Sequence, residues 1–274
     1  MKNTLAKQHN PQQPIPSNQI SLFDILNDPQ PTVPTNIVSF PIQPQITKPT
    51  HIQQRVSPIR DPEKVNQIFK SLMSSGKYGL RNATIFALQL AIGRRTNDIL
   101  SMKISSVYNS TTKSVKSIIT VDEHKTGKTA RDLPINQITR NLLEKYIKTL
   151  KNQSSTALLF PSQKPNPDGT QRPLRTSTLD HIYKEYTSKV FLEEDEQTHI
   201  SSYAARKTYG YNIYMECMKN NNGFLPGTDI NALQYVQSVF NHESSNTTLR
   251  YIGAYDAPAM QLAENIAGQY NFEQ

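Results

Sequence analysis

Apolar residues recur at helical spacing from about residue 59 onward. Asp61 is a favoured helix N-cap residue, and Pro62 after it suits the first position of a helix. The apolar residues that follow at this spacing are Val65, Ile68, Phe69, Leu72 and Met73. A second helix is predicted from about Leu80 to Ile92, and because it is apolar on most sides we expect it to be central. Gly93 is expected to end it, and a short helix is predicted over 97–102.

The period of the pattern changes in the middle of the chain. Residues 116–122 read KSIITVD, a segment rich in β-branched residues that is typical of a strand. Residues 125–128 (KTGK) are expected to form a turn, and 130–135 the return strand. The sequence therefore predicts a small antiparallel hairpin inside a helical domain.

Helical spacing resumes after the hairpin. The next apolar series comprises Ile138, Leu142, Leu143, Tyr146, Ile147 and Leu150. Further helices are predicted over 177–190, 201–218 and 229–240. In the last of these the residues expected to face inward are Ile230, Leu233, Val236, Val239 and Phe240. Asn246 is expected to cap a short helix that carries Tyr251. The predicted fold class is mainly α with a small antiparallel β-sheet (α+β), over residues 58–256.

The two ends of the chain differ from this domain. Residues 1–57 are rich in Pro, Gln, Asn and Thr and show no sustained apolar period. Such a segment buries too little surface to offset its ordering entropy, so we expect a disordered arm. Residues 257–274 are expected to form a C-terminal helix and tail, with an apolar strip of Met260, Leu262 and Ile266.

Composition narrows the class of protein. The formal net charge of +8 suits a polyanionic partner, because Lys and Arg that neutralise phosphates release counterions. The single cysteine, Cys217, excludes an intramolecular disulfide and a cysteine metal cluster. The sequence has neither a run of apolar residues that would span a bilayer nor the apolar core of a signal peptide. We expect a cytoplasmic protein with no membrane partner.

Four segments carry residues suited to chemistry on phosphate. They are AIGRRTNDIL (91–100), HKTGK (124–128), SYAARKTYGY (202–211) and FNHESSNTTLRYIG (240–253). In the last, His242 precedes Tyr251 by nine positions, which can place a hydrogen-bonding imidazole and a nucleophilic phenol around one phosphate. The order and spacing of the four segments resemble the catalytic domain of the tyrosine recombinase (phage integrase) family.

The resemblance implies a role for each matching residue. Tyr251 would be the nucleophile, and Arg95 and Arg206 the two arginines that hold the phosphate, a task that suits the planar guanidinium fork. His242 would hydrogen-bond the phosphate, and Lys125 would protonate the leaving 5′ oxygen. Neither a cofactor nor a metal is expected, since the positive side chains would take the place of a metal.

Several neighbouring residues compete for these roles or support them. Asp98 would buttress the arginine pair. Arg94, Lys128 and Tyr255 are the alternatives to Arg95, Lys125 and Tyr251. Residues expected to contact DNA are Arg94, Lys128, Lys207 and Arg250.

The sequence departs from the family in two places. Tyr203 stands three residues before the second arginine, where the family usually has His; a phenol can still hydrogen-bond a phosphate but is a poor base near pH 7. His199 is a possible substitute. The family also carries a helical domain before the catalytic one, where this sequence shows only the polar arm before Ile59, so we expect weak DNA binding by an isolated monomer.

The resemblance implies a site-specific recombinase or integrase of a mobile element, which acts on double-stranded DNA through a 3′-phosphotyrosine. It also implies a homo-oligomer on DNA, with a tetrameric synapse. The protein would be associated with a bacterial nucleoid. The C-terminal strip would dock in a neighbouring subunit or pack on its own domain. A type IB topoisomerase and a catalytically impaired DNA-binding protein on the same fold remain the alternatives.

The arm contains one further motif. Gln19, Leu22 and Phe23, within QISLF, resemble the short peptide by which bacterial replication and repair proteins dock on the DNA polymerase sliding clamp. The alternative is that this apolar island packs on the catalytic domain.

Overall fold

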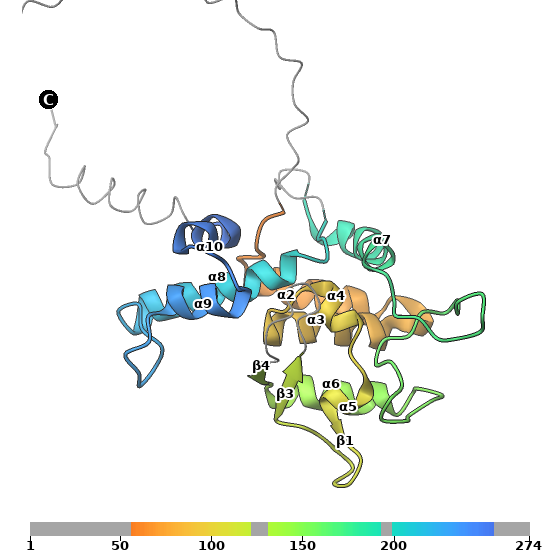
Figure 1. Cartoon of the computed structure of the whole chain (residues 1–274). Helices are drawn as coiled ribbons and strands as arrows, with labels where there is room; N and C mark the ends of the chain where they lie inside the picture. Colours follow the sequence, from red (N-terminus) through yellow and green to blue (C-terminus); the bar gives the residue numbers. More distant parts are fainter. Residues whose placement is uncertain (1–55, 122–130, 193–198, 255–274) are drawn as a thin grey trace, which may run out of the picture. The chain divides into compact units, whose positions relative to one another are not determined.

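The structure, a computed structural model, describes residues 56–121, 131–192 and 199–254, which all lie in the compact unit Ile52–Gln274 (Figure 1). Several residues named by the sequence analysis lie outside the described residues: Gln19, Leu22 and Phe23 of the arm, Lys125 and Lys128 of the hairpin tip, Tyr255, and the strip at 257–267. The elements in chain order are α2 (Pro62–Met73), η1 (Gly76–Tyr78), α3 (Gly79–Ile92), α4 (Thr96–Leu100), α5 (Ile104–Val107), β1 (Tyr108–Asn109), β2 (Ser114–Val115), β3 (Ile118–Val121), β4 (Arg131–Pro134), α6 (Gln137–Ile147), α7 (Thr176–Thr187), η2 (Ser188–Val190), α8 (Ala204–Asn220), α9 (Ala232–Phe240) and α10 (Ser245–Ile252). The predicted α+β class is confirmed. None of the described helices is both long and apolar enough to cross a bilayer.

Helix α3 is the centre of the fold, as its apolar pattern predicts. It packs against α2, α6 and α8, and most of its residues are buried. Helix α2 begins as predicted, with the Asp61 side chain accepting a hydrogen bond from the Glu63 amide at 2.8 Å. Gly93 ends α3 in the left-handed conformation, with φ of 59°. A Cβ at this position would lie 2.2 Å from the ring of Tyr209, so Gly93 also lets α8 approach closely.

Two antiparallel strand pairs flank the helices. The predicted hairpin is β3 and β4, in which Ile119 pairs with Leu133 and both side chains are buried. The two-residue strands β1 and β2 and the short helix α5 are elements that the sequence pattern did not reveal. The described strands β3 and β4 bracket residues 122–130, where Lys125 falls.

Helices α8, α9 and α10 pack together around a second apolar core, and Figure 1 shows α9 running beside α8. Gly210 of α8 allows this packing, since a Cβ there would lie 2.7 Å from the ring of Phe240. Helix α10 is capped by Ser244, whose hydroxyl accepts from the Thr247 amide at 3.1 Å, so the prediction of Asn246 as the cap was wrong. Asn246 lies inside the helix instead.

Two apolar residues of the predicted helical series are on the surface, and one of them, Ile230, was expected to face inward. Ile138 is 74% exposed at the start of α6, and Ile230 is 49% exposed before α9 begins. Both stand at the beginning of their series, before the helix face meets the core. The remaining positions of these series are buried or half-buried.

Candidate active site

The structure gathers residues from three segments around one hollow of about 460 Å³. Its lining residues are Arg95, Asn97, Asp98, Tyr203, Arg206, His242 and Tyr251. The N-cap and first turn of α4 supply the first three, the start of α8 the next two, and the segment from the end of α9 into α10 the last two. Six of the seven are residues that the sequence singled out; Asn97 is the addition.

Arg206 is the most deeply placed cation of the hollow, at 3% exposure. Its Nη2 donates to the Phe240 carbonyl at 3.1 Å, and its guanidinium carbon lies 4.3 Å from the centre of the Phe240 ring. Its Nη1 is buried and has no hydrogen-bond partner among the described residues. Burial lowers the pKa of Arg206, because it penalises the charged form. A buried cation with an unused donor is stabilised by an anion, and phosphate is an anion that matches it.

His242 and Tyr251 lie side by side, with ring centres 4.9 Å apart and planes 72° apart. Burial lowers the pKa of His242 to about 4, and the charges of Arg206 and Arg95 add to this. Burial raises the pKa of Tyr251, opposed by the charge of Arg206. Near pH 7 the imidazole is therefore neutral and the phenol keeps its proton.

Hydrogen bonds around Thr248 fix the tautomer of His242. The Thr248 hydroxyl donates to the Ser244 carbonyl at 3.2 Å, and its oxygen lies 3.1 Å from His242 Nδ1. With the hydroxyl proton on the Ser244 carbonyl, the arrangement favours the tautomer in which Nδ1 carries the hydrogen and donates to Thr248. The other ring nitrogen, Nε2, then holds a free lone pair and can accept a proton.

Tyr203 lines the hollow from its rim and is 44% exposed. It stands at the N-cap of α8, one turn before Arg206. His199 does not line the hollow, so its position does not support the substitution for an imidazole that the sequence left open.

The basic residues near the hollow differ in what they can reach. Arg94 is 1% exposed, and its Nη1 donates to the Val239 carbonyl at 3.1 Å. The expectation that Arg94 contacts DNA was therefore wrong: it ties the α3–α4 turn to α9. Lys207 lies with its amino group 4.9 Å from the centre of the Tyr251 ring, and Arg250 is exposed on α10.

A buried hydrogen-bond network joins the two turns that supply the hollow. Gln89 Nε2 donates to the Ser202 carbonyl at 2.9 Å and to the Thr96 hydroxyl at 3.2 Å. The Thr96 hydroxyl donates to the same Ser202 carbonyl at 2.8 Å. Tyr183 donates to Gln89 Oε1 at 2.7 Å, and the Ser202 amide donates to Asp180 at 2.7 Å. Sequence reasoning missed this network; its signal was the glutamine in the otherwise apolar stretch 85–92 of α3.

The chemistry of the hollow is that of an anion site with a nucleophile. Asp98 is 3% exposed beside the arginines, and Asn97 accepts a hydrogen bond from the Thr176 hydroxyl at the start of α7. Among the described residues, no group of three or more His, Cys, Asp or Glu side chains is placed to hold a metal ion. In the part of the chain that the structure describes, Arg95 and Arg206 are the two cations that line the hollow, and the Lys207 amino group lies beside the Tyr251 ring.

Known proteins resemble this chain in sequence. The model described as "Phage integrase family" matches residues 60–257. "Probable integrase/recombinase YoeC" of Bacillus subtilis (strain 168) is 28% identical over 198 residues, which are 72% of this chain and 90% of that protein.

Solved structures share the fold. The XerH site-specific recombinase bound to a palindromic difH substrate, a post-cleavage complex, aligns with a TM-score of 0.52 and 19% identity over 78% of this chain and 53% of that one. The XerA recombinase aligns with a TM-score of 0.50 and 17% identity over 80% of this chain and 65% of that one. This chain therefore matches about half the length of the XerH chain and just under two thirds of the XerA chain.

The family match covers most of the chain and includes every residue that lines the hollow. The chain belongs to the phage integrase family, the tyrosine recombinases.

Proposed function

We propose that this chain is a site-specific DNA recombinase that cleaves and rejoins DNA strands through a 3′-phosphotyrosine intermediate. The observation that supports it most is that Tyr251, neutral His242 and the guanidinium groups of Arg95 and Arg206 line one hollow. These are the groups that a phosphoryl transfer to a phenol needs.

In the cleavage step, the Tyr251 oxygen attacks the scissile phosphorus. A bond forms between this oxygen and phosphorus while the bond to the 5′ oxygen breaks. Arg95 and the unused Nη1 of Arg206 hold the non-bridging oxygens, where negative charge accumulates. The phosphotyrosine bond conserves the energy of the broken bond, so rejoining needs no nucleotide cofactor.

The proton of Tyr251 needs an acceptor, because burial raises the pKa of the phenol. His242 supplies one at Nε2, since Nδ1 donates to Thr248. Once protonated, Nε2–H donates to a phosphoryl oxygen, so one imidazole acts first as acceptor and then as donor. The resemblance assigns protonation of the leaving 5′ oxygen to Lys125.

Duplex DNA is the substrate of this proposal. The net charge of +8 favours a polyanion, and Arg250 and Lys207 lie near the nucleophile on α10 and α8. The names of YoeC and XerH place relatives of this chain among recombinases.

The deciding experiment is a nicked suicide substrate that traps the covalent intermediate. Wild-type protein is expected to give a protein–DNA adduct visible on a denaturing gel. Tyr251→Phe should give none and should bind DNA as tightly, because only the hydroxyl is lost. Tyr255→Phe is the matched control; adduct that survives in Tyr251→Phe and vanishes in Tyr255→Phe would move the nucleophile.

One observation favours a second function. Tyr203 is exposed at the rim, where the family usually has an imidazole, and a hollow impaired by this change would leave a DNA-binding protein without cleavage activity. Absence of adduct from the wild-type protein at saturating DNA would support that alternative. Adduct with supercoil relaxation on DNA with one site, and no exchange between two sites, would indicate a topoisomerase.

A further inference from the structure

A second hollow, of about 500 Å³, lies at the other end of α3. It is formed by the residues around the start of α3, the end of α6 with residues 149–152, and residues 161–163 with Gln171. It shares no lining residue with the active site. The 14-residue helix α3, about 21 Å long, separates the two.

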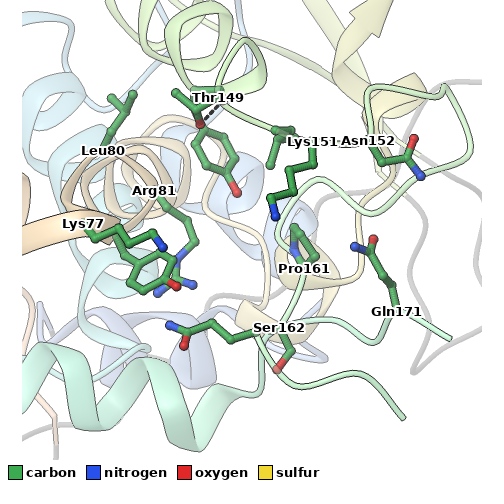
Figure 2. Close-up of a pocket in the computed structure, with 13 residues that line it drawn as sticks. Lys77, Leu80, Arg81, Thr149, Lys151, Asn152, Pro161, Ser162 and Gln171 are labelled. Atoms are coloured by element: carbon green, nitrogen blue, oxygen red, sulfur yellow. Dashed lines mark hydrogen bonds between the residues drawn. The ribbon is translucent and has the colours of Figure 1, made fainter. Parts of the chain in front are cut away.

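The charge of this hollow is one-sided. Lys77, Arg81 and Lys151 line it, and none of its thirteen lining residues is acidic. Figure 2 shows the Lys151 amino group reaching inward from the segment after α6, opposite the Arg81 guanidinium that comes from α3. Positive groups that meet from opposite walls favour an anion between them.

Arg81 is built into the wall of the hollow rather than lying loose on the surface. It is 6% exposed. Its Nε and Nη2 donate to Asn82 Oδ1 at 3.2 and 2.9 Å, and Asn82 Nδ2 donates to the Ser75 hydroxyl at 2.8 Å, which fixes the amide. The guanidinium also lies 4.6 Å from the centre of the Tyr78 ring. Arg81 is therefore held in one orientation before any ligand arrives.

The partners of Arg81 leave its charge uncompensated. They are an amide oxygen and aromatic rings, and among the described residues no carboxylate forms an ion pair with it. A buried cation of this kind is costly unless an anion pairs with it. Tyr146, which is 4% exposed, adds a phenol that keeps its proton, because burial raises its pKa.

The rest of the lining suits a small organic molecule. Tyr78, Leu80, Leu150 and Pro161 give apolar surface. The polar side chains around them are Thr149, Asn152, Ser162, Gln163 and Gln171. The volume falls within the roughly 300–1,000 Å³ that small-molecule sites occupy. The Arg81 guanidinium is 6% exposed, so an anion has to enter the hollow to reach it, and a small phosphate ester fits that space.

We propose that this hollow, between the start of α3 and the end of α6, binds a small phosphorylated ligand with a planar group, of the nucleotide class. Its phosphate would lie between Arg81 and Lys151, with Lys77 at the mouth, and its planar group against Tyr78 and the apolar wall. A bound ligand would join α3, the helix that ends at the active-site turn, to α6.

The test is ligand-dependent thermal stability and calorimetry of the full chain, without DNA. Inorganic phosphate and adenosine monophosphate are expected to raise the midpoint of unfolding, since a ligand that binds only the folded state stabilises it. Adenosine, which lacks the phosphate, should not. A Lys77→Gln/Lys151→Gln variant should weaken the binding of adenosine monophosphate by about tenfold or more.

Both lysines are exposed, so this variant should fold. The matched control is Lys145→Gln/Lys148→Gln, which removes the same charge from exposed positions of α6 and its C-cap outside the hollow and should bind within about twofold of wild type. Arg81→Lys, which keeps the charge but loses the fork, should weaken binding as well.

Three results would overturn the proposal. One is no binding of phosphate or adenosine monophosphate at about 10 mM. A second is equal binding by wild type and both double variants, which would place the anion elsewhere. A third is displacement of adenosine monophosphate by a short duplex whose own affinity falls in the Lys77→Gln/Lys151→Gln variant alone, which would assign the hollow to the DNA backbone.

Discussion

Burial sets the protonation states of the two residues at the centre of the active site. His242 has a pKa of about 4 in the folded chain, because burial and the charges of Arg206 and Arg95 disfavour the imidazolium. Burial also raises the pKa of Tyr251, although the charge of Arg206 opposes this shift, so the phenol keeps its proton. These protonation states are the ones that the proposed proton transfer from phenol to imidazole requires.

The lowered pKa of His242 predicts how stability depends on pH. The unfolded chain binds the proton with an ordinary pKa of about 6.5 and the folded chain with one of about 4, so protons favour unfolding between these values. The contribution is fully present above about pH 6.5 and is lost as the pH falls toward 4. His242→Gln should therefore have a flatter pH dependence of its unfolding midpoint between about pH 7.5 and pH 5. Parallel curves for the two proteins, followed by circular dichroism, would contradict the assignment.

Tyr203 is the residue at which this chain departs most from its family. As an exposed phenol on the rim it can donate one hydrogen bond to a phosphoryl oxygen. Tyr203→Phe should slow cleavage of the suicide substrate by about tenfold, the effect of one lost hydrogen bond to a charged group, with little change in DNA affinity. Tyr203→His should cleave at least as fast as wild type. A folded Tyr203→His protein without cleavage would show that the site is adapted to the phenol.

At the scale of elements, the network around Gln89 holds the α3–α4 turn against the start of α8. Thr96→Val removes one hydroxyl at constant shape and leaves the Gln89 amide and Ser202 carbonyl each short of a partner. We expect a loss of about 1–3 kcal/mol in unfolding free energy. Because Arg95 and Tyr203 adjoin this network, the cleavage rate at saturating DNA should fall more than DNA affinity does.

Thr96→Ser is the matched control, since it keeps the hydroxyl and loses only a methyl group. It should restore most of the cleavage rate relative to Thr96→Val, measured by single-turnover cleavage. Equal rates in the two variants, or a loss confined to stability, would show that the network supports the fold without positioning the active site.

Local sequence determines where some of the helices begin and end. Asp61 and Gly93 act through backbone groups within a few residues, so the start of α2 and the end of α3 are predictable. The central place of α3 follows because a helix that is apolar on most sides needs partners all round. The inward assignment of Ile230 was wrong because spacing alone does not show where a helix begins to meet the core.

The active site was predictable as a set of residues but not as a network. Four segments in order identified Arg95, Arg206, His242 and Tyr251, whose roles remain proposals. The burial of Arg94 depends on the Val239 carbonyl, far away in sequence, and the tautomer of His242 depends on the Ser244 carbonyl. Neither contact leaves a trace in residue spacing.

At the scale of the whole molecule, two kinds of cation serve different purposes. Arg206 is buried in the hollow, where we propose that it holds one phosphate, while Arg250 is exposed on α10, the helix that carries Tyr251. The net charge of +8 indicates that many further cations can meet the backbone. Affinity for DNA should therefore come mainly from counterion release by exposed cations. Catalysis should depend instead on Arg206 and Arg95 in the hollow.

This division predicts the salt dependence of DNA binding. The logarithm of the affinity should fall linearly with the logarithm of salt concentration, and Arg250→Gln should reduce the slope by about one while single-turnover cleavage at saturating DNA stays near wild type. Arg206→Gln should instead abolish most cleavage, because it removes the cation that meets the developing charge.

Fluorescence anisotropy on one half-site and on two adjacent half-sites gives the slopes. The paired site should bind more tightly, because a second bound copy adds avidity. A slope that Arg250→Gln leaves unchanged, or nanomolar binding of one half-site by a monomer at physiological salt, would contradict this account.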